Sequence, residues 1–220
     1  MFHRLLSAIF PPKCILCGKI LEKDETDLCR TCRVEAPEYS KGKLNVQFLD
    51  SFAAVWYYEE NVRRSILRYK FYGARQFAPA YGRLLAMRIL NDLPRADLIT
   101  WVPVSRKRLR QRGYDQVELL AQAVSAELGI PAIKTLEKFR DNRANSGLRD
   151  PAERRANVLG VYRPVQPEAF RGRRVLLLDD IVTTGATASE CARVLLTAGA
   201  GEIIFGAVAA GGTTSSKKVQ

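Results

Sequence analysis

Histidine is almost missing from this 220-residue chain, which contains only His3. That scarcity excludes most histidine-based schemes of acid–base or nucleophilic catalysis. No apolar run approaches the roughly 20 residues that a membrane-spanning helix needs. The start, residues 1–14, is weakly signal-like, but prolines and cysteines stand where a small-residue cleavage site belongs. We therefore expect a cytoplasmic protein without a membrane span.

Acidic residues are too few to balance the basic ones. The chain has 35 Lys and Arg against 23 Asp and Glu, which gives a net charge of +12 and a pI near 9.7. The arginines gather at 106–112, 140–155 and 171–174 instead of being spread evenly. This balance favours anionic partners such as nucleic acid, phosphorylated ligands or anionic lipid, although solubility alone also explains a basic surface.

Four cysteines stand near the start as two Cys-x-x-Cys pairs: Cys14, Cys17, Cys29 and Cys32. Each pair can bring two thiolates to one metal, and two pairs complete a tetrahedral site that suits structural zinc. Two disulfides, a redox pair and an Fe–S cluster are the alternatives, but a cytoplasmic chain disfavours disulfides. Because four thiolates leave no open coordination position, this zinc should be structural and not catalytic. We therefore expect zinc loss to unfold residues 12–34 and to leave the rest of the chain folded.

The other histidine and cysteine of the chain have no expected role in this site. His3 is not needed as a ligand, and Cys191, at helical spacing among apolar residues, is expected in the core.

The rest of the chain predicts an α/β domain with a parallel sheet. Apolar and β-branched runs favour strands at 51–58, 98–104, 131–136, 174–179 and 202–209. Helical periods cover 61–73, 78–92, 115–129 and 185–198, with Asn61 and Asp115 as expected caps. Strands that alternate with helices are typical of parallel sheets. We divide the chain into a four-cysteine zinc module at 1–36, a linker at 37–50, the α/β domain at 51–212 and a polar tail at 213–220.

The stretch VLLLDDIVTTGAT, residues 175–187, carries the strongest chemical signal. Ligands of open parallel sheets bind outside the carboxyl ends of the strands, so Asp179 and Asp180 are expected at the ligand edge. A helix that begins near Gly185 offers unpaired backbone N–H groups and a partial positive charge. Three threonines add hydroxyl groups: Thr183, Thr184 and Thr187. The pattern predicts a cradle for a sugar phosphate such as ribose 5-phosphate; a Walker loop is excluded because Gly-Lys-Ser/Thr is missing, and a plain turn is the alternative.

This stretch resembles the phosphoribosyl pyrophosphate (PRPP) signature of type I phosphoribosyltransferases. Together with the four-cysteine module, RKRLRQRGYDQVELLA (106–121) and LRDPAERRANVLGVY (148–162) resemble the ComF family, the phosphoribosyltransferase-like proteins of natural competence. The resemblance covers nearly the whole chain. It implies a type I phosphoribosyltransferase-like parallel sheet flanked by helices, with a small zinc-ribbon-like module at the N-terminus.

The resemblance also implies roles for particular residues. Asp179 and Asp180 would bind the ribose hydroxyls, and the loop Thr183, Thr184, Gly185, Ala186 and Thr187 would hold the 5-phosphate. The stretch VPVSRK (102–107) corresponds to the pyrophosphate loop, which makes candidates of Ser105, Arg106 and Lys107, with Mg²⁺ bridging. Residues 140–157 correspond to the flexible loop that closes over the site. Family members often carry glutamine there, where this chain has Asn145.

Whether the chain is an enzyme stays open. PRPP loses pyrophosphate through an oxocarbenium-like state, so catalysis needs mainly positioning and charge, which Arg106, Lys107 and Arg112 could supply. The stretch GAVAAGGTTSSKK (206–218) indicates no particular acceptor base. A fold does not settle an activity.

Two hypotheses about function follow, with a PRPP-sensing regulator as a weaker third. The first is an accessory protein of DNA uptake that handles internalised single-stranded DNA, with a competence helicase as a possible partner. Aromatic and basic residues alternate in RYKFYGARQF (68–77), where rings either stack on bases or belong to the core. The candidate nucleic-acid contacts are Arg68, Lys70, Arg108, Arg110 and Arg112. The second hypothesis is an active PRPP-dependent phosphoribosyltransferase of nucleotide metabolism.

Overall fold

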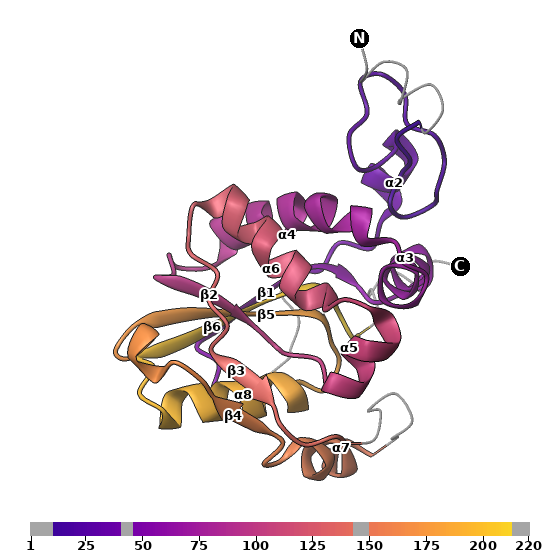
Figure 1. The fold of residues 1–220 in the computed structure, drawn as a ribbon. Helices are drawn as coiled ribbons and strands as arrows, with labels where there is room; N and C mark the ends of the chain where they lie inside the picture. Colours follow the sequence, from indigo (N-terminus) through magenta and orange to yellow (C-terminus); the bar gives the residue numbers. More distant parts are fainter. Residues whose placement is uncertain (1–10, 41–45, 143–149, 213–220) are drawn as a thin grey trace, which may run out of the picture.

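A parallel sheet forms the centre of the computed structural model, which describes residues 11–40, 46–142 and 150–212. Its four strands lie in the order β1 (Ser51–Tyr57), β6 (Glu202–Ala210), β5 (Arg174–Val182) and β2 (Leu98–Trp101) (Figure 1). All three pairings are parallel, with Asp179 beside Ala207 in the register of β5 and β6. The predicted α/β class with a parallel sheet is confirmed.

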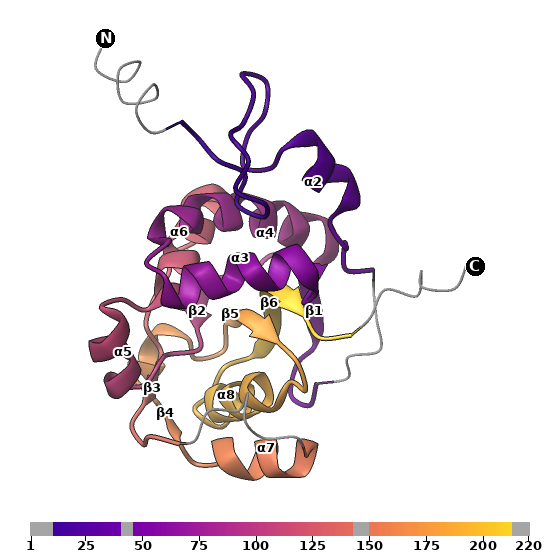
Figure 2. The same ribbon diagram turned by 90° about the vertical axis from the view of Figure 1, so that its right-hand side faces the viewer.

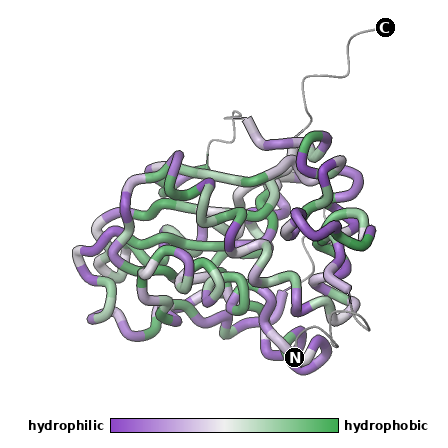
Figure 3. The backbone as a smooth tube through the Cα atoms, turned by 90° about the horizontal axis from the view of Figure 1, so that it is seen from above, coloured by the Kyte–Doolittle hydropathy of each residue, from purple (hydrophilic) through white to green (hydrophobic). Residues whose placement is uncertain are grey.

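Helices cover both faces of this sheet. On one face lie α3 (Glu60–Phe71), α4 (Ala78–Asp92) and α6 (Gln116–Leu128), and on the other lies α8 (Ala186–Thr197) (Figures 1 and 2). The two cores separate by strand alternation, since Leu176 and Leu178 pack with the first helices while Val175 and Leu177 pack with α8. Figure 3 shows the hydrophobic segments along the strands and hydrophilic ones mainly at the periphery.

Shorter elements surround the sheet. They are α2 (Arg30–Glu35), α5 (Arg106–Arg112), α7 (Pro151–Val158), the antiparallel hairpin of β3 (Leu136–Lys138) and β4 (Tyr162–Pro164), and the 3-10 turns η1 (Arg75–Phe77) and η3 (Pro167–Ala169). Among the described residues, no helix is both long and apolar enough to cross a membrane. The predictions for His3, Asn145 and the tail 213–220 concern residues outside the described ranges.

Several predicted boundaries are wrong for identifiable reasons. The strand expected at 174–179 continues to Val182, because its pairing with β6 continues to the end of both strands. The strand expected at 131–136 is reduced to one parallel bridge between Ala132 and Ile99, and β3 begins only at Leu136. Helix α3 begins at Glu60, so Asn61 is not its cap and its side chain accepts a hydrogen bond from Arg64 instead.

Other local signals are confirmed. The Asp115 carboxylate accepts hydrogen bonds from the first backbone N–H groups of α6, and left-handed Gly129 ends that helix. Helices α4 and α6 approach closely at Gly82, where an added Cβ atom would lie 2.5 Å from the Cβ atom of Ala123. Glycine at that position therefore sets how near α6 lies to α4.

The four-cysteine module packs against α3 and α4 at one end of the molecule (Figures 1 and 2). The Arg68 guanidinium on α3 donates to the backbone oxygens of Ile15, at 2.9 Å, and Leu16, at 2.7 Å. The side chain of Arg83 on α4 forms a two-pronged ion pair with Asp27. Ile15 and Leu16 are buried in the same core as helix α3, so the module and the helix form one packed unit.

The first part of the predicted linker is attached to the sheet. The Tyr39 backbone N–H donates to the Val55 oxygen at 3.0 Å, and Glu38 bridges to Trp56 of β1. Farther along, Val46 is buried against the loop at Gly185. These contacts bring residues near 46 close to the ligand edge of the sheet.

Candidate functional site

A cavity of about 850 Å³ opens at the carboxyl ends of the parallel strands. It is lined by Tyr58 after β1, by Val104 after β2 and by residues 179 and 181–188 at the end of β5 and the start of α8. Helix α3 and the segment after β2 form the other walls. This is the edge at which open parallel sheets bind ligands, because the strand ends and the helix N-termini meet there.

The loop between β5 and α8 forms the floor of one end of the cavity. Thr183, Thr184 and Thr187 line it, and α8 begins with Gly185 as its N-cap. Gly185 has no side chain to cap α8, and the first turn of a helix presents backbone N–H groups and a partial positive charge that suit an anion. Gly185 has φ of 74°, and an added Cβ atom would lie 2.4 Å from a methyl carbon of Val46. Both the backbone angle and the packing therefore require glycine.

The two adjacent aspartates point to opposite faces of β5, as successive residues of a strand do. Asp180 faces helices α3 and α6 and is 2% exposed. Its carboxylate pairs with Lys70 Nζ at 2.8 Å and accepts a hydrogen bond from Gln116 Nε2 at 2.7 Å. Asp179 lines the cavity, whereas Asp180 lies behind Lys70. The structure therefore places one carboxylate, not two, at the cavity wall.

Asp179 carries an electrostatic cost in the unliganded protein. Burial and the neighbouring Asp180 carboxylate raise the pKa of Asp179 well above its ordinary value, while Lys70 acts in the opposite direction. The Asp179 charge also acts on Lys138, which is 7% exposed, with Nζ 5.4 Å from the centre of the Tyr162 ring. Burial and then Arg108 lower the pKa of Lys138 to about 8. A ligand or cation that binds the ionised Asp179 would relieve this cost.

Basic side chains dominate the remaining wall. They are Arg63, Lys70, Arg108, Arg112 and Arg154. Asp179 is the acid among the described lining residues. Arg112 is held over the Phe71 ring, with its guanidinium carbon 5.0 Å from the ring centre, and it donates to Gln116. The excess of cations suits a ligand that carries several negative charges.

Gln116 is a positioning residue that the sequence reading missed. Its amide links Arg112 on one side to Asp180 on the other, and its backbone oxygen accepts from Tyr69 Oη at 2.6 Å. It is 4% exposed. The signal was available, because Gln116 follows the Asp115 cap and lies within the stretch 106–121 that carries the family resemblance. Gln116 sets the position of Arg112 at the cavity.

The predicted pyrophosphate candidates do not line the cavity. Ser105 is buried and its hydroxyl accepts from the Arg108 backbone N–H at 3.3 Å, as the N-cap of α5. The Arg106 side chain pairs with Glu137 at 2.8 Å, away from the cavity. Lys107 is exposed outside the lining as well. The cavity is instead reached by Arg108 and Arg112, which face it from the same helical segment.

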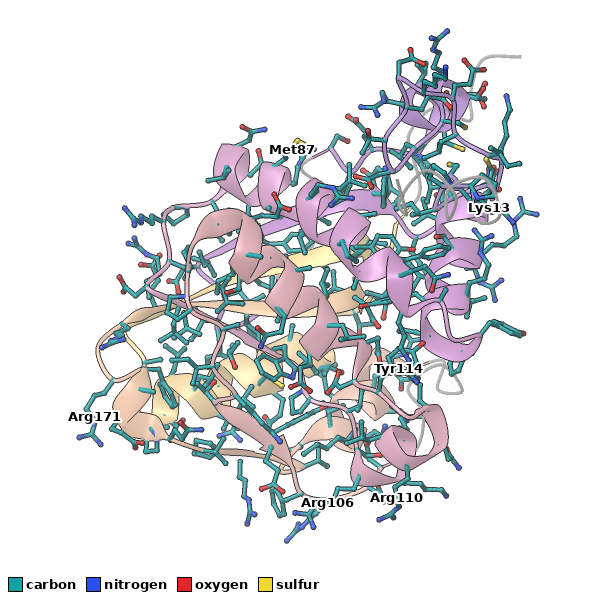
Figure 4. All side chains as sticks on the ribbon, turned by 45° about the horizontal axis from the view of Figure 1, so that its top comes forward. Lys13, Met87, Arg106, Arg110, Tyr114 and Arg171 are labelled. Atoms are coloured by element: carbon teal, nitrogen blue, oxygen red, sulfur yellow. The ribbon has the colours of Figure 1, made fainter. Side chains whose placement is uncertain are left out.

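The predicted nucleic-acid contacts also separate in space. Arg68 holds the four-cysteine module, whereas Lys70, Arg108 and Arg112 line the cavity. Arg110 extends outward from α5 (Figure 4). The aromatics of residues 68–77 divide in the same way: Tyr69 is buried in the core, but Phe71 and Tyr72 are 62% and 79% exposed.

The four paired cysteines form a candidate metal centre. Their sulfur atoms all lie within 4.8 Å of one another, and Cys17 Sγ is 3.7 Å from Cys29 Sγ. Zinc–sulfur bonds of about 2.3 Å in a tetrahedron place sulfur atoms about 3.8 Å apart, so the set fits zinc. All five cysteines are free thiols in the described part of the chain, and Cys191 is fully buried as predicted.

Two protein families match this chain. Residues 5–43 match the double zinc ribbon domain, and residues 118–220 match the phosphoribosyl transferase domain. The first match contains the four-cysteine centre, and the second contains β5, the loop at residues 183–185 and α8. Both predicted modules are confirmed.

Similarity to individual proteins extends over both modules. Competence protein F of Haemophilus influenzae is 29% identical over 87% of this chain and 82% of its own length. Competence protein ComFC of Streptococcus pneumoniae is 26% identical over 87% of this chain and 96% of its own length. DNA utilization protein YhgH of Salmonella typhi is 31% identical over 61% of this chain and 60% of its own length.

A solved structure gives a weaker likeness. The glutamine PRPP amidotransferase of B. subtilis shares 22% identity with a TM-score of 0.45, and the alignment covers 64% of this chain but only 30% of that one. The assignment therefore depends on the domain matches, the full-length relatives and the observed sheet. This chain is thus similar to competence proteins F and ComFC over 87% of its length, and in it a double zinc ribbon match precedes a phosphoribosyl transferase match.

Proposed function

We propose that this protein is an accessory protein of DNA uptake that handles single-stranded DNA and binds PRPP in its cavity. The observation that carries the ligand assignment is the composition of one cavity. It brings together Asp179, five basic side chains and, at the N-terminus of α8, the loop with Thr183, Thr184 and Thr187, which we call the threonine loop. PRPP has a monoester phosphate, a ribose with free hydroxyls and a diphosphate. Each of these three groups has a chemically matched wall.

The ligand would lie with its 5-phosphate at the start of α8. There the backbone N–H groups and the hydroxyls of Thr183, Thr184 and Thr187 can donate to it. Asp179 would accept from a ribose hydroxyl. Lys70, Arg108, Arg112 and Arg154 would surround the diphosphate, since guanidinium groups bind phosphate oxygens in pairs.

Magnesium is the cation that such a ligand brings. Proteins commonly bind Mg²⁺ through one or two carboxylates together with substrate phosphates, and Asp179 at a cavity with room for a diphosphate fits that donor set. Bound Mg²⁺ would neutralise diphosphate charge. Asp180 would act indirectly, because its carboxylate holds Lys70 and Gln116 in place.

Phosphoribosyl transfer is a second candidate function. In that reaction the C1–oxygen bond to the diphosphate breaks, the diphosphate leaves with the bonding electrons, and an acceptor forms the new bond to C1. The cationic wall favours it, because Arg108 and Arg112 would stabilise the leaving diphosphate. Pyrophosphate release from PRPP with candidate bases, nucleosides and amines tests this activity. If none of these acceptors stimulates pyrophosphate release, transfer is not supported, and ligand binding alone is the role of the cavity.

The binding assignment is tested by isothermal titration with PRPP and Mg²⁺. We expect wild type to bind and Asp179→Asn to bind at least about tenfold more weakly, because a neutral amide loses a charged hydrogen bond. Asp24→Asn is the matched control, since Asp24 is an exposed carboxylate of the four-cysteine module, 63% accessible, outside the cavity. Equal affinity of all three proteins, or no binding by wild type, would contradict the proposal.

A further inference from the structure

A second basic surface lies outside the cavity, on α5 and the β3–β4 hairpin. We call it the basic ridge and define it by Arg106, Lys107, Arg110, Phe139, Arg140 and Arg163. All six side chains are exposed. Figure 4 shows Arg106 and Arg110 extending outward from α5 at the bottom of the view, apart from Arg171 at its left edge.

Ion pairs join the two parts of the ridge. The Glu137 carboxylate on β3 pairs with Arg106 of α5 at 2.8 Å and with Arg163 of β4 at 2.6 Å. These arginines stay accessible, with side chains 77% and 55% exposed. Within residues 106–112, 137–141 and 162–164, the acids are Glu137 and Asp141, so the surface keeps a clear excess of positive charge. The Glu137 carboxylate therefore holds Arg106 and Arg163 near each other, and the ridge keeps its net positive charge.

This positive surface includes an aromatic ring. Phe139 is 42% exposed, with the guanidinium carbon of Arg140 5.1 Å and that of Arg163 5.6 Å from its ring centre. Both guanidinium groups lie over the ring in cation–π contacts, which hold the ring in place. It can still offer exposed apolar surface to a planar group, which charge alone does not provide.

The ridge differs from the other arginine groups of the chain. Several arginines are committed to acids of their own surroundings: Arg83 to Asp27, Arg88 to Asp92, Arg174 to Glu202 and Arg193 to Glu190. The ridge has five cations, two of which lie over one exposed ring and two of which share one acid. A ligand with repeated negative charges and flat groups matches that arrangement.

We infer that the basic ridge is the binding surface for single-stranded nucleic acid, with Phe139 stacking on one base and the cations contacting the phosphates. The inference deepens the proposed DNA-handling function and depends on it. A duplex fits less well, because its base faces are already stacked within the helix, whereas a single strand exposes them. The ridge replaces the earlier candidate set, in which Arg68, Lys70, Arg108 and Arg112 are used elsewhere.

Helix α5 separates the two ligands. It directs Arg108 and Arg112 to the cavity and Arg106, Lys107 and Arg110 away from it. A single strand on the ridge would therefore leave the cavity open. PRPP and the oligonucleotide should bind at the same time without direct competition.

The test is fluorescence anisotropy of a labelled oligothymidylate, measured at several salt concentrations. Three variants are compared with wild type: Phe139→Ala, the double variant Arg110→Gln with Arg140→Gln, and the control Arg171→Gln with Arg173→Gln. The control makes the same change of charge at two exposed arginines before β5, of which Arg171 lies apart from Arg106 and Arg110 in Figure 4. PRPP titration of every variant reports separately on the cavity.

We expect Phe139→Ala to weaken oligonucleotide binding about tenfold, as loss of one stacked base does. The ridge double variant should also reduce the slope of log affinity against log salt by about 1.4, since each lost phosphate contact contributes about 0.7. The control should bind as wild type does, and saturating PRPP should leave all affinities unchanged. Three results would overturn the inference: equal weakening in the control, displacement of the oligonucleotide by PRPP, or no oligonucleotide binding by wild type. Loss of PRPP binding alone would count only against the assignment of the cavity.

Discussion

Asp179 and Asp180 are neighbours in sequence but have opposite electrostatic environments. Asp180 is paired with Lys70 and Gln116, so its charge is compensated. Asp179, which is half-buried at the cavity wall, has a raised pKa because partial burial and then the neighbouring Asp180 carboxylate disfavour its charged form. The folded protein therefore binds a proton at Asp179 more tightly than the unfolded chain does, and this residue costs stability as pH rises above its ordinary pKa.

The two asparagine substitutions should consequently change stability in opposite directions. At neutral pH, Asp179→Asn should raise the melting temperature, because it removes a charge that the folded state accommodates poorly. Asp180→Asn should lower the unfolding free energy by about 2 kcal/mol, since it leaves the mostly buried Lys70 without its partner.

Thermal melts between pH 4 and 8 check both effects. The advantage of Asp179→Asn over wild type should grow as pH rises, because ionisation of Asp179 is what the wild type must avoid. Equal destabilisation by both substitutions would show that the carboxylates share one structural role.

At the scale of elements, helix α3 connects the zinc module to the cavity. Arg68 holds the backbone of residues 15 and 16, and Lys70, further along the same helix, reaches Asp180 and the cavity wall. Because the module and α3 share one hydrophobic core, we expect the loss of zinc to affect α3 as well as residues 12–34.

Removal of zinc should therefore weaken ligand binding as well as unfold the module. With a strong chelator, amide hydrogen exchange should accelerate in residues 12–34 and also in α3, while β5 and α8 stay protected. PRPP affinity should fall in the same sample and return when zinc is added back. Faster exchange confined to residues 12–34, with unchanged affinity, would mean that α3 holds its place without the module.

Local signals predicted elements well, and long-range contacts explain what they missed. Asp115 and Gly129 mark the ends of α6 because capping depends on neighbouring backbone groups. The order β1-β6-β5-β2 brings together strands far apart in sequence, which periodicity cannot reveal. The opposite directions of Asp179 and Asp180 would have followed from strand alternation, had the strand been extended to Val182.

At the scale of the whole molecule, the positive charge is divided among three tasks. Arg68 and Arg83 attach the zinc module, Arg108 and Arg112 face the cavity, and the basic ridge faces outward. Composition predicted anionic partners but could not assign each arginine to a task. That assignment depends on the folded positions of the side chains, because adjacent residues such as Lys107 and Arg108 face different surroundings.

We propose that one cavity recognises both ends of a phosphoribosyl diphosphate. The most direct measurement compares the affinities of PRPP, ribose 5-phosphate and pyrophosphate for the wild-type protein, each with Mg²⁺, by isothermal titration. We expect PRPP to bind more tightly than either fragment, by at least about tenfold, because the threonine loop and the cationic wall act on one molecule. Pyrophosphate that binds as tightly as PRPP, together with no binding of ribose 5-phosphate, would show that the cavity is only a polyanion site and would contradict this proposal.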